Sequence, residues 1–251
     1  MSGHSKWSSI KHKKGAADAK RGKLFSKLSR ALIVAAREGG ADPAANLALA
    51  NAIEKARSYS MPKDNIDRAI ARGSGADADA DSFEQVVYEG YGPNGVAVIV
   101  EALTDNRNRT AADVRAAFTK HDGNLGGSGA VAWLFERRGV VIVSATGVEE
   151  DDLFLAAADA GAEDLEQDGD VFQVTSAPEN LAAVRAAIEA AGFAIESAEL
   201  SMIPKTTVAV ESESAAKSVM RLIETLEDDD DVQEVYANFD IPEQVMEAVA
   251  S

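Results

Sequence analysis

Residues 83–104 read FEQVVYEGYGPNGVAVIVEALT. The first half of this stretch is rich in β-branched and aromatic residues, and a nearly continuous apolar run fills the second half. Both patterns are typical of β-strands, and we expect strands at Phe83–Tyr91 and Val96–Leu103. Gly92-Pro93-Asn94-Gly95 lies between them, and Asn-Gly tolerates positive φ in a tight turn. The stretch therefore predicts a β-hairpin.

The chain before the hairpin has the periodicity of helices. Leu24, Leu28 and Leu32 recur every four residues until Gly39-Gly40, which predicts an amphipathic helix over 23–38. Such a helix buries its leucine stripe against other helices, so more helices are expected nearby.

Two further helices are expected before the hairpin. Asp42-Pro43 predicts the start of the second, because Asp caps a helix N-terminus and proline fits the first helical position. This helix is expected to end near Arg57, and a third follows Pro62 and ends at Gly73. Together the helices predict a small N-terminal domain, residues 1–75, and a polar low-complexity linker at 76–82.

The chain after the hairpin alternates between strands and helices. We expect a helix at about 108–121 and a strand at Val131–Phe135. Residues 138–204 then show the order β-α-β-β-α-β of a ferredoxin-like unit. Its expected strands are Gly139–Ser144, Ala162–Gln167, Asp170–Thr175 and Ala194–Ser201, and its expected helices are 148–160 and 178–191.

The region around this unit is incomplete without the end of the chain. Residues 83–137 have the order ββαβ, and 205–240 supply a helix and a strand. We therefore predict that 138–204 is inserted into a discontinuous middle domain formed by 83–137 and 205–240, with a C-terminal tail at 241–251. The predicted fold class is multidomain α and α+β, with a three-helix N-terminal domain and two ferredoxin-like domains.

Charge is strongly segregated along the chain. Residues 1–30 carry nine Lys or Arg and one acid, a formal charge of +8, although the whole chain carries −17. The remaining residues therefore carry −25. A segment so rich in cations is suited to a dense anion, and Lys and Arg gain affinity for nucleic acid by releasing its condensed counterions. A Debye length of about 10 Å allows this arm to act independently of a distant acidic body.

The basic arm is the main candidate binding site. A solvated face and an organelle transit peptide are the alternatives, but the single acid and the direct run into a core-packing helix favour phosphate binding. The candidate nucleic-acid-binding residues are Lys6, Lys11, His12, Lys13, Lys14, Lys20, Arg21, Lys23 and Lys27.

Two other polar stretches are candidates for contact with a partner. The first is the turn TDNRNRT at 104–110, whose Asn or Asp residues cap a helix and whose arginines either pair with nearby acids or bind phosphate. It supplies secondary candidates together with Lys63, namely Asn106, Arg107, Asn108 and Arg109. The second is a flexible glycine-rich loop, which we expect to face a large partner through Gly123, Asn124, Leu125, Gly126 and Gly127. This loop follows a predicted helix and precedes a predicted strand, whereas a nucleotide-binding P-loop follows a strand and precedes a helix.

Catalytic and metal chemistry find no support in the sequence. The chain has no Cys, three His, no Gly-x-Ser-x-Gly and no His-Glu-x-x-His. The acidic run Glu227–Asp231 follows a predicted helix, where acids are unfavourable, so a solvated turn is expected there. We expect no catalytic residue, no cofactor, no metal and no membrane segment.

Several motifs resemble those of one protein family. They are GHSKW at 3–7, MPKDNI at 61–66, YEGYGP at 88–93, LTDNRNRT at 103–110 and GNLG at 123–126. In this order and spacing they are similar to the YebC family, bacterial proteins usually described as DNA-binding transcriptional regulators and related to the mitochondrial translational activator of cytochrome c oxidase. Ala48 and Ala50 stand where relatives often carry a basic residue.

The resemblance implies a three-domain, non-enzymatic, nucleic-acid-binding regulatory protein in the cytoplasm. Two activities are associated with the family, which are promoter DNA binding and ribosome-linked assistance of translation at proline-rich stalls. The expected partner is accordingly DNA or ribosomal RNA. The expected function is that of a transcriptional regulator, and the alternative is a ribosome-associated translation factor. We expect a monomer.

Overall fold

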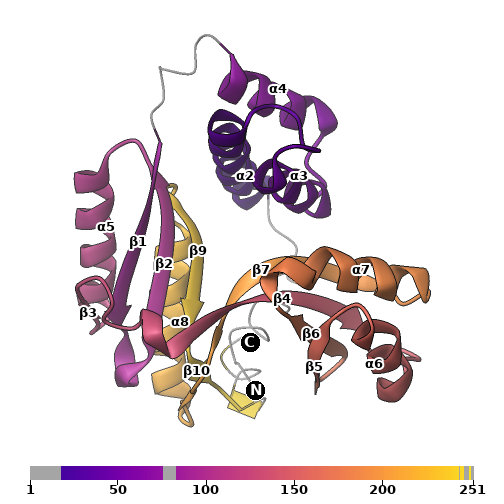
Figure 1. The fold of residues 1–251 in the computed structure, drawn as a ribbon. Helices are drawn as coiled ribbons and strands as arrows, with labels where there is room; N and C mark the ends of the chain where they lie inside the picture. The colour runs from indigo at the N-terminus through magenta and orange to yellow at the C-terminus, as the bar shows by residue number, and fades with distance from the viewer. Residues whose placement is uncertain (1–17, 76–82, 243, 246–248, 250–251) are drawn as a thin grey trace.

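The computed structural model describes residues 18–75 and 83–242, together with 244, 245 and 249, and the side chains from Gly22 onward. The predicted linker at 76–82, most of the basic arm and most of the predicted C-terminal tail lie outside these residues. Within them the chain forms one helical layer and two main β-sheets, each sheet with its own helices (Figure 1). This arrangement confirms a multidomain α and α+β fold.

The helical layer consists of α2 (Asp18–Gly39), α3 (Leu47–Ser58) and α4 (Lys63–Ser74). Its core contains the predicted leucine stripe, in which Leu28 and Leu32 pack with residues of the other two helices, including Leu49 and Ile66. Gly40 follows α2 at φ 87°, a conformation that glycine adopts without strain.

The predicted start of the second helix at Asp42-Pro43 is wrong. Asn46 is the N-cap of α3, and its side-chain oxygen accepts from the Leu49 amide at 3.1 Å. The side-chain nitrogen of Asn46 donates to the carbonyls of Ala35 and Gly40, so Asn46 joins α3 to the end of α2. Asp42 instead accepts from the Ala44 amide in a local turn. Both residue types are good caps, and the buried partners that only Asn46 reaches decide between them.

The first sheet has the strand order β3-β1-β2-β9 and antiparallel pairing throughout. The expected hairpin is formed by β1 (Glu84–Tyr91) and β2 (Ala97–Thr104), and Asn94 and Gly95 adopt φ of 61° and 74° in its turn. The outer strands are β3 (Asn124–Leu125) and β9 (Val232–Ala237). This sheet begins with a hairpin rather than with a β-α-β unit, so its connectivity departs from the ferredoxin-like one expected.

Helices α5 (Arg107–Lys120) and α8 (Glu213–Glu227) pack on one face of this sheet. Phe118 of α5 and Leu222 of α8 are fully buried there with alternate residues of β2, such as Val98 and Val100. The opposite face buries Ile99 and Tyr236 against Phe135, where the second sheet begins. A short parallel pair, β8 (Val208–Ala209) with β10 (Phe239–Asp240), lies at the end of this core.

The predicted strand at Val131–Phe135 is also wrong. Residues 132–134 form a short 3-10 helix, and only Phe135 belongs to a strand. Val131 is buried but Trp133 is exposed, so the apolar run that suggested a strand is divided between a core contact and the surface.

The second sheet has the order β5-β6-β4-β7 and is also antiparallel. Its elements follow the chain in the order β4, α6, β5, β6, α7, β7, which is the strand order and connectivity of a ferredoxin-like unit. Their bounds are β4 Phe135–Ser144, α6 Glu150–Ala158, β5 Ala162–Asp168, β6 Val171–Ser176, α7 Leu181–Ala190 after a 3-10 turn at Pro178–Asn180, and β7 Ile195–Pro204. Both helices cover one face, where Leu153 and Ile188 are fully buried.

Candidate nucleic-acid interface

The predicted binding residues of the basic arm divide into three groups. Lys6, Lys11, His12, Lys13 and Lys14 lie outside the described residues. Lys20 and Arg21 belong to the first turns of α2, where the backbone alone is described. Lys23 and Lys27 follow on the same helix, and both contact another part of the chain rather than solvent alone.

These contacts join α2 to the acidic turn, residues 227–231, at the end of α8. The Lys23 ammonium donates to the Asp228 carbonyl at 3.2 Å, and the Lys27 ammonium donates to the Glu227 carbonyl at 2.5 Å. Arg30, one helical turn further, donates to the Asp230 carbonyl at 2.5 Å. Unpaired carbonyls and the helix dipole make a helix C-terminus negative, so three cations of α2 compensate both the dipole and the acids.

The solvated turn expected at Glu227–Asp231 is correct only in part, because Asp228 and Asp230 are exposed whereas Asp231 is buried and the turn's carbonyls bind cations of α2. The rule that acids are unfavourable at a helix C-terminus is correct for an isolated helix. Here the partners come from about 200 positions earlier in the sequence, and a local pattern carries no information about them.

Asp231 is the centre of the polar network at this junction. Only 4% of the residue is exposed, and its carboxylate accepts from Arg30 at 2.8 Å, Arg109 at 2.6 Å and Thr110 at 2.8 Å. Burial opposes ionisation of Asp231, but the hydrogen bonds from Arg109 and Thr110 and the two guanidinium charges outweigh it. The pKa of Asp231 is therefore lowered from its ordinary value.

A second ionic junction joins α3 to both sheets. The Lys55 ammonium forms ion pairs with Glu234 of β9 and with Glu199 of β7, the latter at 3.2 Å. Burial alone would lower the pKa of Lys55, but the charges of Glu234 and Glu199 outweigh it and raise the pKa well above its ordinary value. Nearby, Arg185 of α7 pairs with Glu54 of α3.

The secondary candidates lie mostly at the start of α5. Asn106 is the N-cap of this helix and accepts from the Arg109 amide at 3.1 Å. The Arg109 guanidinium pairs with Asp105 and Asp231. Of the two roles expected for these arginines, pairing with acids or binding phosphate, Arg109 therefore has the first. Arg107 and Asn108 are exposed on the same turn, and Lys63 is exposed at the first residue of α4. The structure brings Arg109, but not Lys63, to the α2 junction.

The glycine-rich loop is held in place rather than flexible. Asn124 and Leu125 pair with Tyr91 and Gly90 of β1, and the Gly126 amide donates to the Glu89 carbonyl. The Glu89 carboxylate, in a residue only 6% exposed, accepts from three amides of the following segment, those of Gly129, Val131 and Ala132, at 2.7–2.8 Å. Burial would raise the pKa of Glu89, but the three amide donors outweigh it and lower the pKa.

Sequence reasoning missed the role of Glu89. An acid inside a predicted strand looks like an ordinary surface residue, and the only local signal is the dense run of glycines that brings several amides together about 40 residues later. The segment that Glu89 anchors presents Trp133, which is 66% exposed. The indole donates to the Ala130 carbonyl, and the Tyr91 hydroxyl donates to the same carbonyl.

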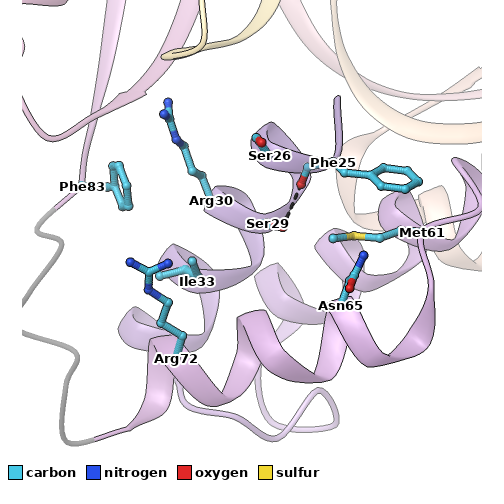
Figure 2. Close-up of a pocket in the computed structure, with 9 residues that line it drawn as sticks. All are labelled: Phe25, Ser26, Ser29, Arg30, Ile33, Met61, Asn65, Arg72 and Phe83. Atoms are coloured by element: carbon cyan, nitrogen blue, oxygen red, sulfur yellow. Dashed lines mark hydrogen bonds between the residues drawn. The ribbon is translucent and has the colours of Figure 1, made fainter. Parts of the chain in front are cut away.

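A pocket of about 410 Å³ lies between α2, α4 and the start of β1 (Figure 2). Its polar lining consists of hydroxyls, an amide and the guanidiniums of Arg30 and Arg72, and its apolar lining includes Phe25 and Phe83. The Arg30 guanidinium lies 5.4 Å from the centre of the Phe83 ring. Guanidiniums and hydroxyls are groups that can bind an anion, although the Arg30 guanidinium is already bonded to Asp230 and Asp231.

Neither a metal cluster nor a membrane helix is found in the part of the chain that the structure describes. There, no three or more His, Asp or Glu side chains are grouped so that they could hold a metal ion. Likewise, none of the described helices is long and apolar enough to cross a membrane.

Comparisons with known proteins agree with this architecture. A model of the "TACO1/YebC protein N-terminal domain" matches residues 5–76, and a model of the "TACO1/YebC second and third domain" matches residues 83–239. Proteins from Rubrobacter xylanophilus and Desulfotalea psychrophila, both named "Probable transcriptional regulatory protein", are 61% and 54% identical to this chain over 250 residues. Each match covers 100% of this chain and 100% of the relative.

A solved structure extends this agreement to the fold. The crystal structure of a conserved hypothetical protein from Aquifex aeolicus superposes with a TM-score of 0.81 at 50% identity, and the match covers 90% of this chain and 93% of that one. The two models together match most of the chain, and full-length relatives share more than half of its residues. The chain therefore belongs to the YebC/TACO1 family.

Proposed function

We propose that this protein is a nucleic-acid-binding transcriptional regulator that acts through its basic N-terminal arm and is not an enzyme. One observation carries the proposal, which is the placement of +8 of formal charge in residues 1–30 of a chain whose remainder carries −25. The printed names of the relatives from R. xylanophilus and D. psychrophila support a regulatory role. Phosphate contacts of this kind position a protein on nucleic acid without reading its sequence.

The described structure supports a role for α2 in extending this arm. Lys20 and Arg21 lie at its start, and Lys23, Lys27 and Arg30 follow within three turns. A helix that carries cations at this density can follow a phosphate backbone. We further propose the domain division that this role uses, namely 1–75 as the basic domain, 83–137 with 205–240 as the middle domain and 138–204 as an inserted domain, in a monomeric cytoplasmic protein.

The salt dependence of binding tests the proposal. If six to eight phosphates are neutralised on duplex DNA, log K falls against log salt with a slope of about −5 to −7. Lys13→Glu with Lys20→Glu should weaken binding to all sequences alike. Lys205→Glu with Lys217→Glu changes the net charge equally on the acidic body and is the matched control. A slope near zero, or equal losses in the two variants, would contradict the proposal.

A ribosome-associated translation factor that binds ribosomal RNA and assists synthesis at proline-rich stalls is the second candidate. The loop anchored by Glu89 favours it, because a rigid loop that presents an exposed Trp133 is suited to contact with a folded partner. The −25 body also repels an extended duplex more than a compact RNA that touches the arm alone.

Co-sedimentation with ribosomes and DNA gel shifts in one buffer at physiological salt separate the two candidates. The translation factor should sediment with ribosomes and lose this property when residues 1–22 are deleted. The transcriptional regulator should shift DNA under the same conditions and remain in the supernatant. Trp133→Ala should weaken ribosome binding but leave the DNA shift unchanged.

A further inference from the structure

We infer that the acidic turn, residues 227–231, is an intramolecular ligand for the cationic face of α2 and competes with nucleic-acid phosphate for Lys23, Lys27 and Arg30. This inference rests on the proposed function, because the competition matters only if α2 binds phosphate. It adds to that function an autoinhibited state, in which the cations nearest the arm are covered by the protein's own C-terminal half.

The geometry of the junction resembles that of a phosphate backbone. Lys23, Lys27 and Arg30 lie three to four residues apart, so they form one stripe along α2. Each of them donates to a different carbonyl of the turn, those of Asp228, Glu227 and Asp230 respectively. A row of oxygens in a strongly negative segment thus meets a row of cations, which is the same chemistry that a phosphate row offers.

The junction consists of charge-assisted hydrogen bonds and the Arg30–Asp231 ion pair rather than of apolar packing, which makes it reversible. The core of the helical layer consists of residues between Leu24 and Ile70 only, and the cores of the two sheets contain none of these residues. The contacts that join the layers include the α2 stripe with the turn, Lys55 with Glu234 and Glu199, and Arg185 with Glu54. Ionic contacts at a partly exposed surface are weakened by salt and exchanged for other anions at little cost.

Asp231 fixes the position of the turn itself. Its carboxylate is held by Thr110 and Arg109 from the body as well as by Arg30 from α2, and the Leu103 amide donates to its carbonyl at 2.8 Å. The turn therefore keeps its shape when α2 leaves. Competition follows, because nucleic acid and the turn require the same three side chains and cannot both contact them fully.

The first test weakens the internal competitor. Asp228→Asn, Asp229→Asn and Asp230→Asn together remove three charges but retain the carbonyls and the oxygen of residue 229 that accepts from the Asp231 amide. We expect the triple variant to bind a duplex DNA or ribosomal RNA fragment about five- to tenfold more tightly than the unchanged chain, since the competent state is populated more.

The matched control carries Glu150→Gln, Asp151→Asn and Asp152→Asn. These exposed acids begin α6 on the second sheet, and their neutralisation changes the net charge by the same amount. At physiological salt we expect no more than about a twofold gain from this variant, because charges beyond a Debye length are largely screened.

The second test observes the opening directly. The chain has no cysteine, so Ala71→Cys on α4 and Ala116→Cys on α5, both exposed, accept a pair of fluorescent labels specifically. Energy transfer between the labels should fall when salt or the nucleic-acid fragment is added to the full chain. It should already be lower in the triple Asn variant at low salt.

The outcomes separate this inference from the proposed function. A selective gain in affinity in the triple Asn variant, together with the fall in energy transfer, supports the inference. If the unchanged chain binds the fragment but the two charge variants gain equally and bound nucleic acid leaves the transfer unchanged, the inference is overturned and the proposed function stands. If neither the chain nor any variant binds at any salt concentration, the proposed function fails and the inference fails with it.

Discussion

At the scale of single residues, Asp231 connects more of the molecule than any pattern in its neighbourhood suggests. It follows four other acids in the sequence, yet it is the one whose carboxylate is buried, and it accepts both from α2 of the helical layer and from α5 of the first sheet's layer. The difference between Asp231 and its neighbours is set by Thr104 at the end of β2 and Thr110 of α5, hydroxyl donors that the fold brings to its carboxylate.

Asp231→Asn tests this assignment. Asn retains the shape but loses the charge that Arg30 and Arg109 face, so we expect the free energy of unfolding to fall by about 2 kcal/mol at neutral pH. Urea unfolding measures it. Asp230→Asn is the control, because that side chain is exposed and Arg30 contacts the carbonyl of residue 230 rather than the carboxylate. Its effect should stay below about 0.5 kcal/mol.

The pH dependence of this loss has a defined sign. The pKa of Asp231 is lowered in the folded protein, so its contribution is fully present above the unfolded pKa of about 3.9 and is lost as pH falls through the folded value. The difference between Asp231→Asn and the unchanged chain should therefore be constant from about pH 5 to 7 and shrink below about pH 4. A difference that grows in acid would show that another group is responsible.

Glu89 gives a second prediction at this scale. Glu89→Gln offers one acceptor oxygen in place of two and points amide hydrogens at the backbone donors of the loop. We expect faster hydrogen exchange at Gly129, Val131 and Ala132, measured by NMR, and a red-shifted Trp133 emission. Glu84→Gln on the exposed end of the same strand should change neither. Unchanged exchange in Glu89→Gln would contradict the anchoring role.

At the scale of elements, the packing of α2 on α4 depends on one glycine. A Cβ at Gly73 would lie 2.3 Å from the Ile33 carbonyl oxygen, closer than real Cβ atoms approach, and 3.0 Å from the Ala36 Cβ, a tight contact. Gly22, also helical, has nothing within 4 Å of such a Cβ. The two glycines therefore form a matched pair in which only the packing differs.

Alanine at these two positions should change stability in opposite directions. Gly22→Ala should raise the free energy of unfolding of the helical layer by about 0.5–1 kcal/mol, because alanine favours helix. Gly73→Ala gains the same propensity but forces α2 and α4 apart, and we expect a net loss of about 2 kcal/mol. Thermal unfolding followed by circular dichroism measures both. Stabilisation by Gly73→Ala would contradict the close approach.

Elements were predictable where their signal is local. The leucine stripe of α2, the Asn-Gly turn of the hairpin and the succession of helices and strands along 138–204 all depend on neighbours a few residues apart. The start of α3 was not predictable, because Asp42 and Asn46 are equally good caps by residue type. Only the burial of Asn46 in the fold distinguishes them. The strand predicted at Val131–Phe135 failed for a similar reason, since Glu89 binds those amides and removes them from strand pairing.

The candidate site was predictable in composition but not in geometry. Charge counting finds the cations of α2 without any structure. It cannot show that Lys23 and Lys27 meet the acidic turn, because a contact over 200 positions leaves no periodic trace in the sequence. For the same reason the role of Glu89 was not predictable, because Glu89 is distant in sequence from the loop that it binds.

At the scale of the whole molecule, separate cores joined by ionic contacts predict salt-dependent cooperativity. At low salt the helical layer and the sheets should unfold together, because the α2 and Lys55 junctions couple them. At about 1 M NaCl, where the Debye length is about 3 Å, the helical layer should unfold as a separate transition at lower temperature. Differential scanning calorimetry at the two salt concentrations measures this. A single unfolding transition at both salt concentrations would contradict ionic junctions between the helical layer and the sheets.

The pairing of β2 with β9 also determines the order in which the protein can be completed during synthesis. Val98 and Ile99 pair with residues 237 and 236, so the apolar edge of β2 has no partner until almost the entire chain has left the ribosome. The sheet at 135–204 can close earlier, and the helical layer earlier still. A nascent chain thus carries its basic helix uncovered, beside an open β-edge, until its last few dozen residues emerge. Chains truncated before residue 232 keep that edge open permanently and are natural substrates for chaperones and proteases.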